Sequence, residues 1–132
     1  MVKTSGRYNS HLLCLSSLIY LLAAVIAFPK SHALSALIFM VTIFSILHHA
    51  KHRNMQLETV DWILGISLTL AALYLFRDFL LVYILLCILI IFRTFDFFVF
   101  QVKRYRVYNY SHSVWHLISS LAIVILSILE KT

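Results

Sequence analysis

The stretch FLLVYILLCILIIFRTFDFFVF, residues 79–100, decides the class of fold. It is long enough to cross the hydrocarbon core of a bilayer, which takes about 17–25 apolar residues of helix. Two charged residues, Arg93 and Asp96, interrupt its last part. A lone strand in lipid would leave its backbone hydrogen bonds unsatisfied, so we expect a transmembrane helix here.

Four further apolar runs accompany this stretch, at residues 11–28, 33–50, 60–76 and 112–129. The composition agrees, since 62% of the 132 residues are hydrophobic. Only 12% are charged, about half the share of an ordinary soluble domain. With two glycines and one proline, the chain has little room for linkers. We therefore expect an all-α fold, a polytopic membrane helical bundle of about five transmembrane helices that forms one domain over residues 1–132.

The first apolar run has an alternative interpretation as a cleaved signal peptide. Lys3 and Arg7 precede the run and Ser31-His32-Ala33 follows it, as the charged start and small-residue end of such a peptide would. The run is longer than the apolar core of most signal peptides, so we favour a retained helix.

The distribution of basic residues predicts the orientation. The N-terminal segment and the gaps after the second and fourth runs hold eight basic residues, and the opposite side holds three. The eight are Lys3, Arg7, Lys51, Arg53, Arg93, Lys103, Arg104 and Arg106, and the three are Lys30, Arg77 and Lys131. Because Lys and Arg concentrate on the cytosolic side, we expect an integral membrane protein with a cytosolic N-terminus. The net charge of +6 then faces lipid headgroups, and no nucleic-acid partner is expected.

Polar residues inside membrane helices are costly, so each one is a candidate for function. Ser45 and His49 are four residues apart and share one face of the second helix. Asp61 is expected in the first turn of the third helix. His112 and His116 are again four apart, in the fifth helix. The predicted topology brings all five residues to the same end of the bundle.

Three neutral imidazoles beside a carboxylate suit a catalytic zinc site, which has three protein ligands and an open position for water. The carboxylate would orient or deprotonate that water. Each residue also has a simpler interpretation. His48, His49 and His52 would extend a basic patch at the interface, Ser45 would bond a carbonyl one turn back, and Asp61 would be an acid favoured by the helix dipole. Their occurrence on three helices at one depth favours the metal site.

Three short segments resemble the CREST superfamily of membrane hydrolases, which includes alkaline ceramidases, progestin/adipoQ receptors and membrane proteins that remodel GPI-anchor lipids. The segments are FSILHH at 44–49, LETVDW at 57–62 and SHSVWHL at 111–117. The family pattern is Ser-x3-His late in one helix, Asp at the start of the next, and His-x3-His in the last. The resemblance implies a lipid amide or ester hydrolase with Zn²⁺ on His49, His112 and His116. It also implies Ser45 and Asp61 as the catalytic partners and a membrane lipid as substrate.

Within this resemblance, His49 rather than His48 is the expected ligand, because only His49 follows Ser45 by four residues. Family members usually have seven helices, so two would be missing between the third helix and the last. Losing an even number keeps His112 and His116 on the correct side. It also removes walls from the lipid cavity, so a homo- or hetero-oligomer that completes the bundle is a candidate partner arrangement.

Two rival interpretations come from other classes of protein. The first is a zinc-stabilised receptor or scaffold membrane protein, in which the metal pins helices together without turnover. The second is a small membrane protein that binds no metal and relies on partners for its missing helices. Bound zinc would exclude the second rival, and turnover of a lipid would exclude the first.

The predicted topology is testable by cysteine labelling. In a chain carrying Cys14→Ser and Cys87→Ser, single cysteines placed at positions 3 and 131 should react with a membrane-impermeant reagent from opposite sides, with position 3 cytosolic. An odd number of spans requires this result. Labelling of both positions from one side would contradict it.

Overall fold

The computed structural model describes residues 8–51 and 54–129, which form six α-helices and, within those ranges, no strand. The helices are α1 Ser10–Ser17, α2 Ile19–Ala27, α3 His32–Ala50, α4 Met55–Leu75, α5 Leu80–Gln101 and α6 Tyr105–Leu129. α1 and α2 together form one span, so five segments are long and apolar enough to cross a membrane. The prediction of an all-α bundle of five such helices is confirmed.

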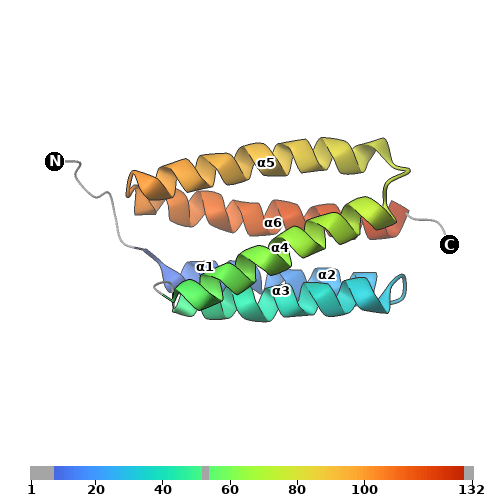
Figure 1. Ribbon diagram of the computed structural model, residues 1–132, viewed down its shortest axis with the longest axis horizontal. Helices are drawn as coiled ribbons and strands as arrows, with labels where there is room; N and C mark the ends of the chain where they lie inside the picture. Colours follow the sequence, from blue (N-terminus) through green and yellow to red (C-terminus); the bar gives the residue numbers. More distant parts are fainter. Residues whose placement is uncertain (1–7, 52–53, 130–132) are drawn as a thin grey trace.

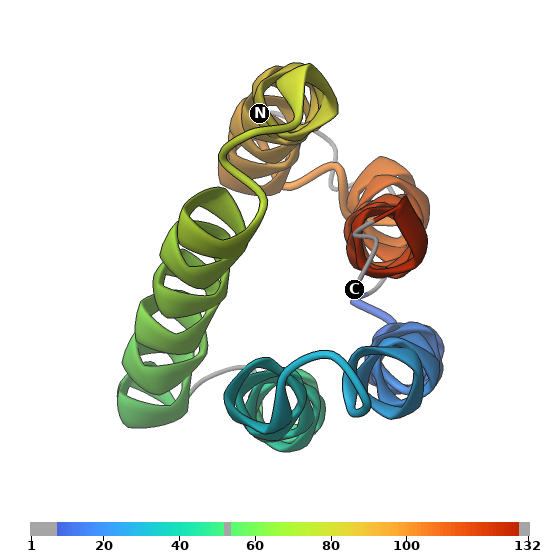
Figure 2. The same ribbon diagram turned by 90° about the vertical axis from the view of Figure 1, so that its right-hand side faces the viewer.

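The helices run back and forth along one direction, so that the starts of α1, α4 and α6 and the ends of α3 and α5 gather at one end (Figure 1). Seen from one end, α5, α6, the α1–α2 pair, α3 and α4 follow one another around a ring (Figure 2). α4 crosses the bundle at a slant and packs mainly against α3, with little contact to α5. The ring is therefore closed most loosely between α4 and α5.

Small residues allow α2 to pack closely against its neighbours. Ala23, Ala24 and Ala27 are buried. The Ser35 hydroxyl of α3 donates to the Ala24 carbonyl at 2.7 Å, and the Ser120 hydroxyl of α6 donates to the Ile19 carbonyl at 3.1 Å. Lipid supplies no hydrophobic drive between helices, so close backbone approach and hydroxyl bonds of this kind hold membrane helices together. The α2–α3–α6 contact is the packed side of the bundle.

The outer surface is apolar, as a lipid-facing surface must be. Leu80 and Ile91 on α5 are 74% and 69% exposed, and Leu70 on α4 is 61% exposed. In water, apolar exposure on this scale would drive association. The five long apolar helices and this surface together indicate a membrane protein. Among the residues used for the orientation, Lys3, Arg7, Arg53 and Lys131 lie outside the described ranges, as does His52, so the cytosolic N-terminus stays a prediction.

The first span differs from the single helix predicted at 11–28, because it breaks at Leu18. The hydroxyls of Ser16 and Ser17 both donate to the Leu13 carbonyl at 2.9 Å. The Leu18 amide then bonds the Leu15 carbonyl three residues back, at 3.2 Å. Serine back-bonding of this kind favours bending of a helix, and here two such bonds fall directly before the interruption. The same two serines face α6, where they take part in the site described below.

Two helices begin earlier than their apolar runs. α4 starts at Met55 rather than residue 60, because the Asn54 side chain accepts from the amides of Gln56 and Leu57 and caps the helix. Asp61 consequently lies in the second turn, not the first as predicted. α6 starts at Tyr105 rather than residue 112, so its two histidines lie two to three turns inside the helix. α5 continues unbroken through Arg93 and Asp96.

Candidate metal centre

Three histidines from two helices meet in the interior. His49 comes from the end of α3, and His112 and His116 come from α6. One ring nitrogen of each lies within 4.8 Å of the corresponding nitrogens of the other two. The rings are packed face to edge or tilted, with centroids 4.7–5.2 Å apart. All three side chains are buried, and His49 is 0% exposed.

The Nδ1 atom of each imidazole is held by a side chain from another segment. Asp96 Oδ2 of α5 lies 2.8 Å from Nδ1 of His112. Ser16 Oγ of α1 lies 2.8 Å from Nδ1 of His116. The Tyr8 hydroxyl, just before α1, lies 2.8 Å from Nδ1 of His49.

These contacts assign the tautomer of the two α6 histidines. An ionised carboxylate only accepts hydrogen bonds, so Nδ1–H of His112 donates to Asp96. The Ser16 hydroxyl already donates to the Leu13 carbonyl, so Nδ1–H of His116 donates to Ser16. In both rings the unprotonated nitrogen is then Nε2, whose lone pair is free to bind a metal.

The ring of His49 has one nitrogen held by the protein and one that is buried without a partner in the described residues. Its Nε2 is buried and, in the part of the chain that the structure describes, has no hydrogen-bond partner. Burial raises the pKa of the Tyr8 hydroxyl well above its usual value, with a smaller contribution from Tyr108, so Tyr8 stays protonated and holds Nδ1. A buried polar atom without a partner costs about 1–3 kcal/mol, which an ion bound at Nε2 would remove.

The donor set fits a metal ion. Three neutral imidazoles, each fixed through its second nitrogen, are the usual arrangement at metal sites, where the outer partner sets the ring orientation and raises ligand basicity. The buried group of His49, His112 and His116 could therefore hold a metal ion.

Ser45 lies beside this cluster but contacts it through another serine. Its hydroxyl is 3.1 Å from Ser17 Oγ, and Ser17 Oγ is 3.3 Å from Nδ1 of His116. Ser45 is buried and lines the cavity described next. Its hydrogen bond thus runs to α1 and not to a carbonyl one turn back, which was the simpler interpretation.

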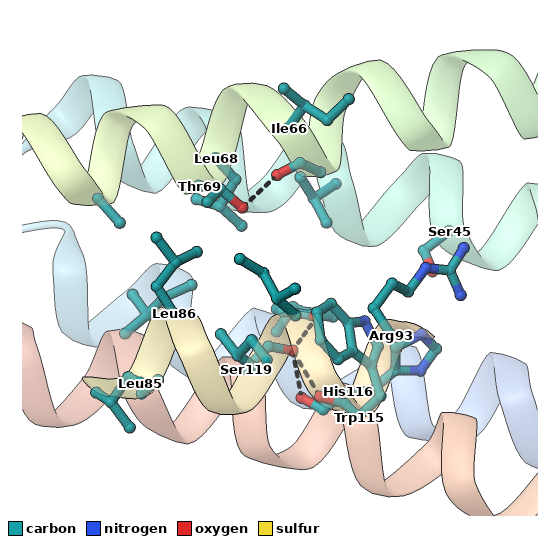
Figure 3. Close-up of a pocket in the computed structure, with 18 of the residues that line it drawn as sticks. Ser45, Ile66, Leu68, Thr69, Leu85, Leu86, Arg93, Trp115, His116 and Ser119 are labelled. Atoms are coloured by element: carbon teal, nitrogen blue, oxygen red, sulfur yellow. Dashed lines mark hydrogen bonds between the residues drawn. The ribbon is translucent and has the colours of Figure 1, made fainter. Parts of the chain in front are cut away.

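A cavity of about 300 Å³ extends from the cluster between α3, α4, α5 and α6. Its polar end is lined by Ser45, Asp61, Arg93, His112 and His116. The remainder is mostly apolar, with Leu68, Leu73, Val82, Leu85, Leu86, Leu89, Ile90, Ile123 and Leu126. Figure 3 shows Ser45, Arg93 and His116 toward one end of this space and Leu85 and Leu86 toward the other.

Asp61 reaches the same cavity from α4. Within residues 8–51 and 54–129 its carboxylate makes no hydrogen bond, so both oxygens are available to an occupant of the cavity. All five residues predicted for the site thus belong to the cluster or line the adjoining cavity. His48, the alternative to His49, is not part of the metal-binding group.

The sequence prediction missed the residues that hold the imidazoles. Asp96 is fully buried and also accepts from the Ser111 hydroxyl. Its position inside an apolar run was a signal for function, because an ionisable residue at membrane depth needs a partner. Ser16 and Tyr8 carried no such signal, since their contacts span about a hundred and about forty residues of sequence.

Fold and site together define a class of protein: a polytopic α-helical bundle with a buried tri-histidine group at the polar end of an apolar cavity. No protein-family model matches the chain, and comparison with curated proteins and with solved structures gives no significant match.

Replacing each neighbouring histidine separately tests the ligand set. His49→Ala should lose the bound metal, because its Nε2 faces the other two rings, and His48→Ala should keep it. Metal content of the purified protein, measured by elemental analysis, is the readout. Loss of metal in His48→Ala with retention in His49→Ala would place the ligand one residue earlier.

The carboxylate behind His112 should tune metal affinity. Asp96→Asn keeps the shape but removes the negative charge, and affinity should fall about 10–100-fold. Competition with a chromophoric chelator measures this change. The control is Asp78→Asn. Asp78 is exposed and lies in the α4–α5 connection, so its substitution should leave metal affinity unchanged. Equal affinity of Asp96→Asn and wild type would contradict the assignment.

Proposed function

We propose that this protein is an intramembrane zinc-dependent hydrolase that cleaves an amide or ester bond of a membrane lipid. The observation that carries the proposal is a group of three buried imidazoles, two of which, His112 and His116, line the polar end of a cavity that is otherwise mostly apolar. A metal group of this kind, opening toward lipid-compatible space, suits hydrolysis at the junction between an acyl chain and its headgroup.

The donor set supports zinc among the metals. Neutral imidazoles suit Zn²⁺, and three protein nitrogens leave a coordination position open, as in catalytic zinc sites. A zinc ion held there would supply Lewis-acid polarisation of the scissile carbonyl and a nucleophile at neutral pH.

The shape of the cavity supports an acyl chain as occupant. His112 and Leu126 both line it, and their separation on α6 corresponds to about 21 Å at about 1.5 Å per residue. That length exceeds half of the roughly 30 Å hydrocarbon core of a bilayer. An extended acyl chain would lie along the apolar part, with its carbonyl beside His112 and His116.

The chain's own residues would supply the proton transfers. The Asp61 carboxylate, which makes no hydrogen bond within the described ranges, would accept a proton from the attacking water. As the C–N or C–O bond breaks, the same proton would pass to the leaving amine or alcohol. The Ser45 hydroxyl would donate to the oxyanion that develops on the carbonyl, exchanging its bond to Ser17 for this one. The products are a fatty acid and the deacylated lipid.

The network around the cluster also supports a second candidate function, a zinc-stabilised receptor or scaffold. The ligands come from α3 and α6, and their Nδ1 partners come from α1, α5 and the segment before α1. A bound ion would therefore tie most of the bundle together without any turnover. An oligomer that covers the loosely closed side between α4 and α5 is compatible with either function.

Asp61→Asn separates turnover from metal binding. Release of fatty acid from a panel of phospholipids and ceramides in proteoliposomes should fall by about 10²-fold or more, because the general base is lost. Zinc content should change little, because three imidazoles complete the protein's share of the site. The matched control is Glu58→Gln, an exposed acid one turn earlier on α4, which should keep full activity.

Two outcomes would overturn these roles. If Asp61→Asn strips the metal while His116→Ala retains it, the ligand and the base are misassigned. If the wild type holds zinc and hydrolyses no lipid on the panel, the receptor or scaffold function replaces the hydrolase.

A further inference from the structure

Arg93 is a charged residue placed deep in the bundle. It lies eight residues before the end of α5 at Gln101, or about 12 Å along the helix axis. It is half-buried and lines the cavity. A cation at such a depth is costly and normally faces the bundle interior and pairs with an anion or with backbone carbonyls.

The protein itself satisfies only part of this guanidinium, which hydrogen-bonds the Tyr108 side chain. The guanidinium carbon lies over the Trp62 ring, 4.4 Å from its centroid, and this contact provides no conventional hydrogen-bond acceptor. Nη1 is 3.4 Å from Nδ1 of His112, but that nitrogen already donates to Asp96 at 2.8 Å. Within the described ranges no carboxylate lies within 4.0 Å of Arg93, since the ion pair found there joins His112 to Asp96.

A guanidinium has five N–H donors in a planar fork. Arg93 lines the cavity, so the donors that the protein leaves without an acceptor are available to an occupant of that cavity. Asp61 lines the same cavity from α4 but stays beyond ion-pairing distance. An anionic group in the cavity, beside both the Arg93 fork and the imidazole cluster, would accept hydrogen bonds from the donors that remain.

The depth of Arg93 identifies the part of the lipid that would reach it. The short α5–α6 connection follows Gln101, and His112 lies about as far beyond this connection as Arg93 lies before it. His116 is one turn deeper, and the apolar part of the cavity runs deeper still, to Leu126. With the acyl chain in the apolar part and the carbonyl at the cluster, the headgroup lies at the level of Arg93.

We propose that Arg93 binds a phosphate in the headgroup of the substrate, so that the protein acts on phosphate-bearing lipids in preference to neutral ones. The proposal rests on the proposed function in taking a lipid substrate as the occupant of the cavity. A phosphate diester offers two acceptor oxygens to the planar fork, which makes such pairs bidentate and strong. A diacylglycerol or ceramide headgroup offers only hydroxyl and amide groups and would leave the charge uncompensated.

The test measures binding without turnover. The purified full-length protein, with and without chelator, is titrated with dioleoyl phosphatidylglycerol and with dioleoylglycerol, which carry the same chains, and complexes are counted by native mass spectrometry. The wild type should bind phosphatidylglycerol at least about tenfold more tightly. Inorganic phosphate and oleate, neither of which joins a phosphate to an acyl chain, should bind at least about tenfold more weakly than phosphatidylglycerol.

Three variants assign the preference to Arg93. Arg93→Gln should reduce the ratio of the two affinities to near one while dioleoylglycerol binding stays unchanged. Arg93→Lys, which keeps the charge but loses the fork, should give an intermediate ratio. Arg104→Gln removes the same charge at the same end of the bundle, from an exposed position that does not line the cavity, and should keep the wild-type ratio.

The outcomes separate this proposal from the hydrolase function. A wild type without preference would overturn it, even if Arg93→Gln fails to fold. A preference that is lost in Arg104→Gln and kept in Arg93→Gln would also overturn the proposal, because it would indicate a headgroup site on the surface. Binding of inorganic phosphate or oleate as tight as that of phosphatidylglycerol would overturn it too. A preference that depends on Arg93 in a protein that hydrolyses nothing would support the binding site and remove the hydrolase. Hydrolysis of phosphatidylglycerol and dioleoylglycerol at equal rates, in the wild type and in Arg93→Gln alike, would support the hydrolase and remove the phosphate preference.

Discussion

Imidazole nitrogens that are buried away from water must find partners inside the protein, and in this bundle that requirement shapes the packing. His49, His112 and His116 come from α3 and α6, and their Nδ1 partners come from three further segments: the residues before α1, α1 itself and α5. An unpaired polar group in a low-dielectric interior costs more than one in water, so the helices are held in the register that supplies the partners. The network therefore connects α1, α3, α5 and α6 at one end of the bundle.

The break in the first span belongs to the same network. Ser16 and Ser17 turn back to the Leu13 carbonyl, and this directs their oxygens toward His116. The contact with Ser16 fixes the tautomer of a buried histidine, which is the form that a metal ligand needs.

The slanted helix α4 forms the loosely packed wall of the cavity and carries two residues of its polar end. It packs against α3 and contacts α5 little, so the wall between α4 and α5 is formed by few buried residues. Regions with few buried contacts open most readily. α4 also carries Asp61 and Trp62 to the polar end, so the element that is held least firmly is the one that brings a carboxylate and the ring that orients Arg93. Entry of a lipid from the side and assembly of the polar end would involve the same helix.

Most of the architecture could be predicted from the sequence, because crossing a membrane imposes a length and a composition that are visible without knowledge of contacts. The five apolar runs were predictable for that reason, and so was the gathering of Ser45, His49, Asp61, His112 and His116 at one end, which follows from counting spans. Helix starts were less predictable: Asn54 caps α4 before its apolar run begins, and α6 extends seven residues into a polar segment.

Only the tertiary structure decided which residues hold the imidazoles and what surrounds Arg93. Asp96 could be suspected from its depth, but its pairing with His112 depends on how α5 is rotated against α6, and the Ser16 and Tyr8 contacts join positions far apart in the chain. The physical reason is that a membrane constrains each helix along its own axis, through hydrophobic length, and says nothing about rotation around that axis. Rotation is set by side-chain packing and by hydrogen bonds between helices, which exist only once the helices have come together.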